Sequence, residues 1–176
     1  IHINNILDTT IAPAAINRAV ESEAKLIAEK VVQSLRGVGV FGIEMFLEGN
    51  ELLINEIAPR PHNSGHYSIE ACSISQFEEH IRAILGLPLT KPRLMTPAVM
   101  KNILGIPNYV GTYSFKGIDK ALSIPGLKLH FYGKKFTKPQ RKLGHFTITA
   151  EKIEEALSRA KTVGNLLRVV KQRGSK

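Results

Sequence analysis

The feature that most constrains the fold of this chain is a strand-turn-strand pattern that leads directly into a polar loop. Residues 38–47 and 52–57 are rich in branched and aromatic side chains, and residues 48–51 between them have the composition of a tight hairpin turn. The loop that follows, residues 58–66, holds two prolines, an arginine, two histidines and a glycine. Few structural loops need this combination, whereas a site that handles metal-bound phosphate does.

A turn centred on Asn50 sets the register of this hairpin. It places Phe46 opposite Ile54 and Glu44 opposite Glu56. Side chains in facing positions lie roughly 4.5–5.5 Å apart at Cβ, where like charges repel each other, so two carboxylates among apolar strands favour a cation between them. Magnesium takes oxygen ligands and usually binds one or two carboxylates together with substrate phosphates. The alternatives are a chance pair on a solvated sheet face and a register one residue off.

The loop after the hairpin has the donors and the stiffness of a binding site. Prolines on both sides of Arg60 remove two backbone donors and restrict the chain, and the planar guanidinium suits phosphate or carboxylate. His62, Asn63 and His66 add further donors, and Gly65 lets the backbone approach a ligand. Each residue alone has an ordinary alternative as a turn or surface residue. Their density beside the paired carboxylates favours a site.

Five segments of the chain form a known pattern: residues 42–46, 55–66, 75–78, 130–134 and 141–145. Together they closely resemble the carboxyaminoimidazole ribonucleotide synthases of purine biosynthesis, which belong to the ATP-grasp superfamily. The resemblance extends from about Asp8 to about Leu167, and around Pro61 and Tyr67 it is strongest to the fungal form, in which the synthase is fused to a carboxylase domain.

Another enzyme of the same superfamily stays open as an alternative. Glycinamide ribonucleotide formyltransferase typically has aspartate and threonine after the histidine of the polar loop, where this chain has Asn63 and Ser64. The difference favours the synthase.

The resemblance implies an ATP-dependent carbon–nitrogen ligase. ATP would activate bicarbonate as carboxyphosphate, and the amine of aminoimidazole ribonucleotide would capture the carbon dioxide. By position, Glu44 and Glu56 would bind magnesium, with manganese as the alternative ion. Asn55 and Glu56 would contact the nucleotide.

The remaining implied roles concern the reacting substrates. Arg60, His62 and Asn63 would be catalytic and would line the ribonucleotide and bicarbonate pocket. Lys134 and Arg141 would hold the phosphate of the ribonucleotide. The turn after Lys134 is longer than usual in the family, so Lys135 stays open as the lysine that would contact the phosphate in place of Lys134.

The resemblance also implies an α/β fold in two parts: the C-terminal part of an ATP-grasp fold in residues 1–94 and a small β-rich domain in residues 95–167. Residues 168–176 would be a tail or linker. The N-terminal doubly wound domain and the lid of the family are not found in the sequence, so we expect the fragment alone to be inactive. Expected partners are that missing half, a fused or separate carboxylase or mutase domain, and further copies in a cytoplasmic homo-oligomer.

Local patterns predict the secondary structure outside the hairpin. Cys72 lies in an apolar helical pattern and is expected to be a buried core thiol, with no disulfide and a reducing compartment. Phe77, Ile81 and Ile84 are expected to face inward from the same helix. The predicted helices are 13–35, 69–85 and 151–167, and the predicted strands are 98–104, 127–132 and 142–149.

The charge distribution keeps a second class of function open. Residues 1–100 carry a net charge of −3, whereas residues 101–176 carry +12, which is typical of a nucleic-acid-binding module. The cations are spread over helix and strand patterns, no recognised nucleic-acid motif is found, and aromatic residues make up only 6% of the chain. We therefore place nucleic acid second to phosphorylated substrates. No apolar segment reaches the roughly 18 residues of a membrane span.

Overall fold

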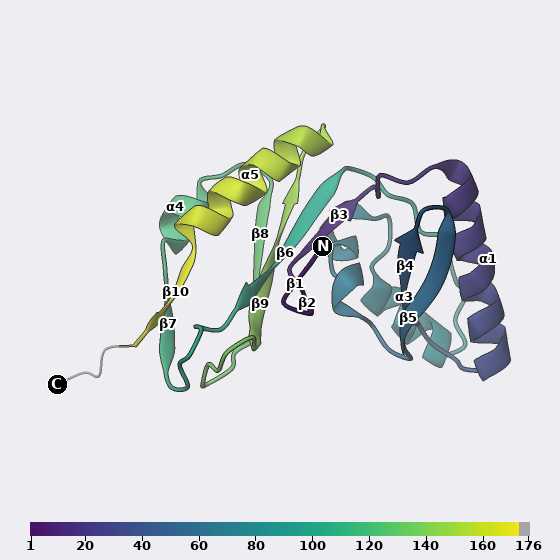
Figure 1. The fold of residues 1–176 in the computed structure, drawn as a ribbon, viewed down its shortest axis with the longest axis horizontal. Helices are drawn as coiled ribbons and strands as arrows, with labels where there is room; N and C mark the ends of the chain where they lie inside the picture. Colours follow the sequence, from purple (N-terminus) through teal and green to yellow (C-terminus); the bar gives the residue numbers. More distant parts are fainter. Residues whose placement is uncertain (173–176) are drawn as a thin grey trace. The chain divides into compact units, whose positions relative to one another are not determined.

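The computed structural model describes residues 1–172, which divide into two compact units (Figure 1). The first, here called the sheet unit, contains Ile1–Ala12 and the chain from Met95 onward, and the second, the hairpin unit, contains Pro13–Leu94. The first twelve residues therefore make their contacts with the later part of the chain. The division into domains at residues 94 and 95, which follows the family, stays a prediction.

The sheet unit is built on a four-stranded antiparallel sheet in the order β3-β6-β9-β8. The predicted strands at 98–104 and 142–149 are confirmed with the same bounds, and the predicted strand at 127–132 ends one residue earlier. The strands and the helices that accompany them are β3 Thr9–Ala12, β6 Ala98–Leu104, α4 Ile118–Leu122, β8 Leu127–Phe131, β9 Lys142–Thr149 and α5 Ile153–Leu166.

The core of this unit lies between the sheet and α5. Alternate residues of a strand point to one face, and in this way Val99, Phe146 and Ile148 come to lie in one buried cluster with Ala160 and Val163 of α5. Figure 1 shows the helix running along this face of the sheet. The helix predicted at 151–167 is confirmed, with its ends trimmed by one or two residues.

Two short ribbons complete the sheet unit. One pairs β1 (His2–Ile3) with β2 (Ile6–Leu7), and the other pairs β7 (Tyr113–Lys116) with β10 (Arg168–Lys171). Residues 168–171 were expected to begin a tail, but they form a strand because β7 offers an antiparallel partner. The end of the predicted tail, residues 173–176, lies outside the described residues.

In the hairpin unit, helix α1 (Arg18–Leu35) lies beside the hairpin of β4 (Gly42–Glu48) and β5 (Glu51–Ala58). The predicted helix began at residue 13, but Asn17 caps the observed helix by accepting a hydrogen bond from the Val20 N–H at 2.9 Å. The hairpin turn lies in the predicted segment, but it consists of Gly49 and Asn50, with Glu48 opposite Glu51, and is not centred on Asn50. Gly49 adopts a φ of +61° there, which is why glycine suits the two-residue turn.

The helix predicted at 69–85 is wrong as a single element. The chain forms a four-residue helix α2 (Ser68–Ala71), a bridge between Cys72 and Leu94, and a separate helix α3 (Gln76–Ile84). The break occurs because Ser75 caps α3, its side chain accepting a hydrogen bond from the Glu78 N–H at 3.2 Å. Cys72 is partly buried, and this burial raises the pKa of its thiol.

The apolar side chains of α3 do not face a core in the described residues. Phe77, Ile81 and Ile84, which were expected to point inward, are 39%, 52% and 55% exposed. Across residues 1–172, no helix combines the length and the hydropathy that a membrane span requires.

Candidate functional site

The facing carboxylates predicted from the turn are present in the hairpin. Glu44 of β4 stands opposite Glu56 of β5, as the register centred on Asn50 predicts. The same register fails nearer the turn, where Phe46 stands opposite Leu53 and not opposite Ile54.

A β-bulge between Glu44 and Met45 explains the change of register. Met45 pairs with Ile54 while Glu44 pairs with Glu56, so Asn55 is an extra residue on β5. A bulge bends its strand and re-aims a side chain, often next to an active site. Here the Asn55 amide donates a hydrogen bond to Glu44 Oε2 at 3.4 Å, which brings Asn55 to the carboxylate of the opposite strand.

A second facing pair shows that opposed carboxylates alone do not define a site. Glu48 and Glu51 also stand opposite each other, but both are exposed beside the hairpin turn. Glu44 differs because its side chain is only 15% exposed and its Oε1 lies 3.5 Å from His62 Nδ1. The surroundings of Glu44 therefore distinguish the candidate site from the solvated pair.

His62 is a buried member of the polar loop. Its Nδ1 lies 2.8 Å from Ser64 Oγ as well as 3.5 Å from Glu44. Gly42 of β4 makes this packing possible, since a Cβ atom there would lie 2.4 Å from the His62 Cβ. The packing partner of Gly42 is therefore a predicted site residue.

The other predicted residues of the loop are placed differently. Arg60 is exposed, and its Nη1 donates a hydrogen bond to the Pro61 carbonyl oxygen at 3.1 Å. Asn63 is buried at the start of the 3-10 turn Asn63–Gly65. A cavity of about 380 Å³ in the hairpin unit is lined by His62 and by Gln76 of α3, among others.

Gln76 is a residue that sequence reasoning missed as part of the site. It was noted only as part of the matching segment 75–78. In the structure its side chain is bonded to the backbone of the polar loop. A glutamine at the first turn of a helix carries no signal of such a role, because the loop residue it contacts is distant in sequence.

The facing carboxylates of Glu44 and Glu56 suit a hard cation that is shared with a phosphorylated ligand. Glu44 and Glu56 supply carboxylate oxygens, which magnesium prefers. Within residues 1–172 no group of three or more His, Cys, Asp or Glu side chains could hold a metal ion. Magnesium usually binds only one or two carboxylates together with substrate phosphates, so Glu44 and Glu56 are the residues that would hold it.

The predicted phosphate residues lie in the sheet unit, in the loop that joins β8 to β9. Lys134 is exposed, and its carbonyl oxygen accepts a hydrogen bond from the Tyr113 hydroxyl at 2.7 Å. Arg141 is half-buried, and its Nη1 donates to the Phe136 carbonyl oxygen at 3.0 Å. Thr137 pairs with Gly111 through backbone hydrogen bonds of 2.8 and 3.1 Å, so the basic loop is anchored at several points.

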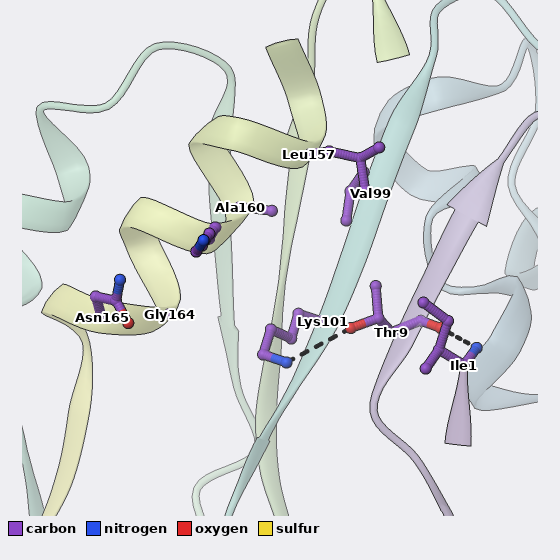
Figure 2. Close-up of a pocket in the computed structure, with 9 residues that line it drawn as sticks. Ile1, Thr9, Val99, Lys101, Leu157, Ala160, Gly164 and Asn165 are labelled. Carbon is purple, nitrogen blue, oxygen red and sulfur yellow. Dashed lines mark hydrogen bonds between the residues drawn. The ribbon is translucent and has the colours of Figure 1, made fainter. Parts of the chain in front are cut away.

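Another cavity of the sheet unit, of about 340 Å³, contains none of the predicted site residues (Figure 2). It lies between β3, β6 and α5, with Lys101 and Thr9 on its wall. Lys101 forms an ion pair with Asp8. Burial alone would raise the pKa of Asp8, but the hydrogen bonds from Lys101 and Thr9 and the charge of Lys101 lower it overall. Lys101 therefore forms a structural ion pair within the sheet unit.

Comparison with known proteins agrees with this geometry. Residues 1–77 match the ATP-grasp domain family, and residues 98–159 match the phosphoribosylaminoimidazole carboxylase C-terminal domain family. The chain therefore contains part of an ATP-grasp protein, the class that its fold and hairpin site indicate.

Particular relatives narrow the class. The chain is 48% identical over 161 residues to a phosphoribosylaminoimidazole carboxylase of Ogataea methanolica, covering 88% of this chain and 29% of that protein. The N5-carboxyaminoimidazole ribonucleotide synthetase of Thermotoga maritima superimposes with a TM-score of 0.89 and 55% identity, covering 93% of this chain and 46% of the other. The Aspergillus clavatus N5-carboxyaminoimidazole synthase, solved in complex with ADP and 5-aminoimidazole ribonucleotide, superimposes with a TM-score of 0.83 and 38% identity, with 94% and 45% covered.

This chain belongs to the N5-carboxyaminoimidazole ribonucleotide synthase family, as the resemblance of its sequence indicated. It spans less than a third of the length of the Ogataea relative and less than half of each of the two solved chains.

Proposed function

We propose that this chain supplies part of the active site of an ATP-dependent ligase that carboxylates 5-aminoimidazole ribonucleotide with bicarbonate through carboxyphosphate. The observation that carries the proposal is the cluster at the end of the hairpin, where Glu44 faces Glu56, Asn55 reaches Glu44, and His62 Nδ1 lies 3.5 Å from Glu44 Oε1. A relative of known structure binds ADP and 5-aminoimidazole ribonucleotide, which supports the same pair of ligands here.

Phosphoryl transfer to bicarbonate needs alignment and charge neutralisation more than covalent help. Glu44 and Glu56 would hold magnesium, which neutralises charge on the phosphates when bound. Asn55, placed by the bulge, would contact the nucleotide phosphates. Arg60 would attract the carboxyphosphate through its exposed guanidinium fork.

The second half of the reaction requires the ribonucleotide amine close to the carbon dioxide. His62 and Asn63 would line this part of the site, and both side chains are buried. Lys134 and Arg141 would hold the ribonucleotide phosphate. A cytoplasmic location, a homo-oligomer and a partner or fused carboxylase domain belong to the same proposal and follow from the family.

The test joins this chain to the portion of a relative that it does not match and measures turnover. We expect ADP formation that depends on both bicarbonate and 5-aminoimidazole ribonucleotide, with label from ¹³C-bicarbonate in the product. Omission of the ribonucleotide is the matched control. ATP turnover that requires glycinamide ribonucleotide and formate would contradict the proposal and favour the formyltransferase.

A further inference from the structure

The side chain of Gln76, the first residue of α3, is bonded to the polar loop at three points. Its Oε1 accepts a hydrogen bond from the His62 backbone N–H at 2.9 Å, and its Nε2 donates to the His62 carbonyl oxygen at 2.8 Å. The same Nε2 lies 2.8 Å from His66 Nδ1. A primary amide has one carbonyl oxygen and two N–H donors, so the loop uses all three groups.

The backbone contacts define which end of the amide is which. A backbone N–H can only donate and a backbone carbonyl can only accept, so the oxygen of Gln76 must face the N–H of His62. The NH₂ group must then face the carbonyl of His62 and the ring of His66. The amide orientation is therefore a consequence of the hydrogen bonds and not a free choice.

Neighbouring residues keep Gln76 in this place. Its own backbone N–H donates to Ser68 Oγ at 3.0 Å, and Ser68 Oγ donates to the Gly65 carbonyl oxygen at 2.6 Å. A Cβ atom at Gly65 would lie 2.7 Å from Gln76 Oε1, so a larger residue at that position would displace the amide. These hydrogen bonds fix the start of α3 against the polar loop.

The contact to His66 has a chemical consequence. The Gln76 N–H donates to Nδ1, so Nδ1 must carry a lone pair, and the proton of a neutral imidazole then resides on Nε2. The ring of His66 is also packed against Phe77, with the ring centroids 5.4 Å apart. Both the tautomer and the plane of the imidazole are thus restricted.

We propose that Gln76 is a positioning residue of the candidate site, which sets the backbone of His62 and holds His66 in the Nε2–H tautomer. A neutral His66 then carries its ring proton on Nε2, where the imidazole can only donate. The catalytic consequence rests on the proposed function, whereas the tautomer is a property of this chain alone. Each is measured separately.

The tautomer is measured by ¹⁵N NMR of the histidine rings in the 176-residue chain. In the unsubstituted chain we expect an unprotonated Nδ1 and a protonated Nε2 at His66. In Gln76→Glu a carboxylate oxygen replaces the NH₂ group, and because a carboxylate only accepts, we expect the proton to move to Nδ1 or the ring to become fully protonated. Gln33→Glu, the same change on the exposed face of α1, should leave the His66 signals unchanged.

A second variant keeps the test decisive if the first variant does not fold. Gln76→Met keeps the length of the side chain and removes all three hydrogen bonds, and it should give a mixture of His66 tautomers. The folded state of each variant is checked by its thermal transition. A protonated Nδ1 in the unsubstituted chain, or His66 signals that are the same in the folded Gln76 variants, would overturn the inference.

The catalytic part is measured in the joined protein used to test the proposed function. Gln76→Glu and Gln76→Met should lower kcat at least about tenfold with a much smaller change in KM for ATP, because displaced site residues slow the chemical step. A kcat equal to that of Gln33→Glu would overturn the positioning role. Lack of turnover in the unsubstituted joined protein would instead count against the proposed function, and the NMR result would still decide the tautomer.

Discussion

His62 Nδ1 lies 3.5 Å from Glu44 Oε1, and both side chains are largely buried, with 10% and 15% of their surfaces exposed. The two residues come from separate parts of the predicted site, the polar loop and the first strand of the hairpin. The Ser64 hydroxyl lies 2.8 Å from the same Nδ1 atom, so this nitrogen is close to both the carboxylate and a residue of its own loop. The contact joins the hairpin and the loop into one candidate site, on which the first predictions depend.

Glu56→Gln should abolish bicarbonate-dependent ATP turnover in the joined protein, because glutamine keeps the volume of glutamate and loses the charge that would hold magnesium. Glu51→Gln is the matched control, since Glu51 belongs to the solvated facing pair with Glu48. Turnover and thermal unfolding are measured for both variants. Near-normal turnover in folded Glu56→Gln would show that the carboxylate pair is not part of the active site.

The 176-residue chain by itself should show no ATP-dependent carboxylation. It covers less than half of each of the two solved relatives compared, and no glycine-rich phosphate loop is found in its sequence. The measurement is ADP release with bicarbonate, 5-aminoimidazole ribonucleotide and magnesium present. Turnover by the purified chain would show that these residues suffice for the nucleotide site.

Arg60→Lys should slow the reaction strongly although it keeps the charge. Lysine is a point charge, whereas the guanidinium fork of Arg60 can hold two oxygens at once, and Arg60 lies between two rigid prolines. We expect a fall in kcat of roughly tenfold to a hundredfold. Arg18→Lys, at the exposed start of α1, is the control. Equal activity of the two variants would leave Arg60 only a diffuse electrostatic role.

Arg141→Ala should raise the KM for 5-aminoimidazole ribonucleotide far more than the KM for ATP. The segment from Lys134 to Lys142, which joins β8 to β9, carries five basic residues and no acidic one, so it repels itself unless an anion is bound. Lys128→Ala removes an exposed cation of β8 outside the loop and should change neither constant. An equal effect of Arg141→Ala on both substrates would assign the loop to general surface charge.

Asp8→Asn should destabilise the chain in a pH-dependent way. The pKa of Asp8 is lowered in the folded state despite its burial, because Lys101 and Thr9 donate hydrogen bonds to the carboxylate. A lowered pKa gives stability above the ordinary carboxyl pKa that is lost as the pH falls through the folded-state value. We expect a loss of about 1–3 kcal/mol in the free energy of unfolding near neutral pH.

That loss should begin to shrink below about pH 4, where the Asp8 carboxylate of the unfolded chain becomes protonated. It should disappear as the pH falls through the lower pKa of the folded state. Asp119→Asn, which makes the same change at an exposed position of α4, should show little effect. Denaturant titrations at several pH values measure both. A difference that does not depend on pH would contradict the role of the charged pair.

The sequence by itself determined the elements whose signals are local. Apolar segments placed β6 and β9 at their observed bounds, and the turn residues placed a hairpin between residues 42 and 58. The motif residues also sufficed to indicate the family. These features depend on residue types within a few positions of one another, so a reader of the sequence can see them.

The tertiary structure alone decided the features that depend on distant segments. The bulge that brings Asn55 to Glu44, the contact of His62 with Glu44, and the bonds of Gln76 to the polar loop all arise from packing between separate elements. The strand at residues 168–171 likewise exists because β7 lies beside it. Such contacts are selected by which backbone groups and side chains fill the same space after folding, and no local pattern in the sequence encodes that choice.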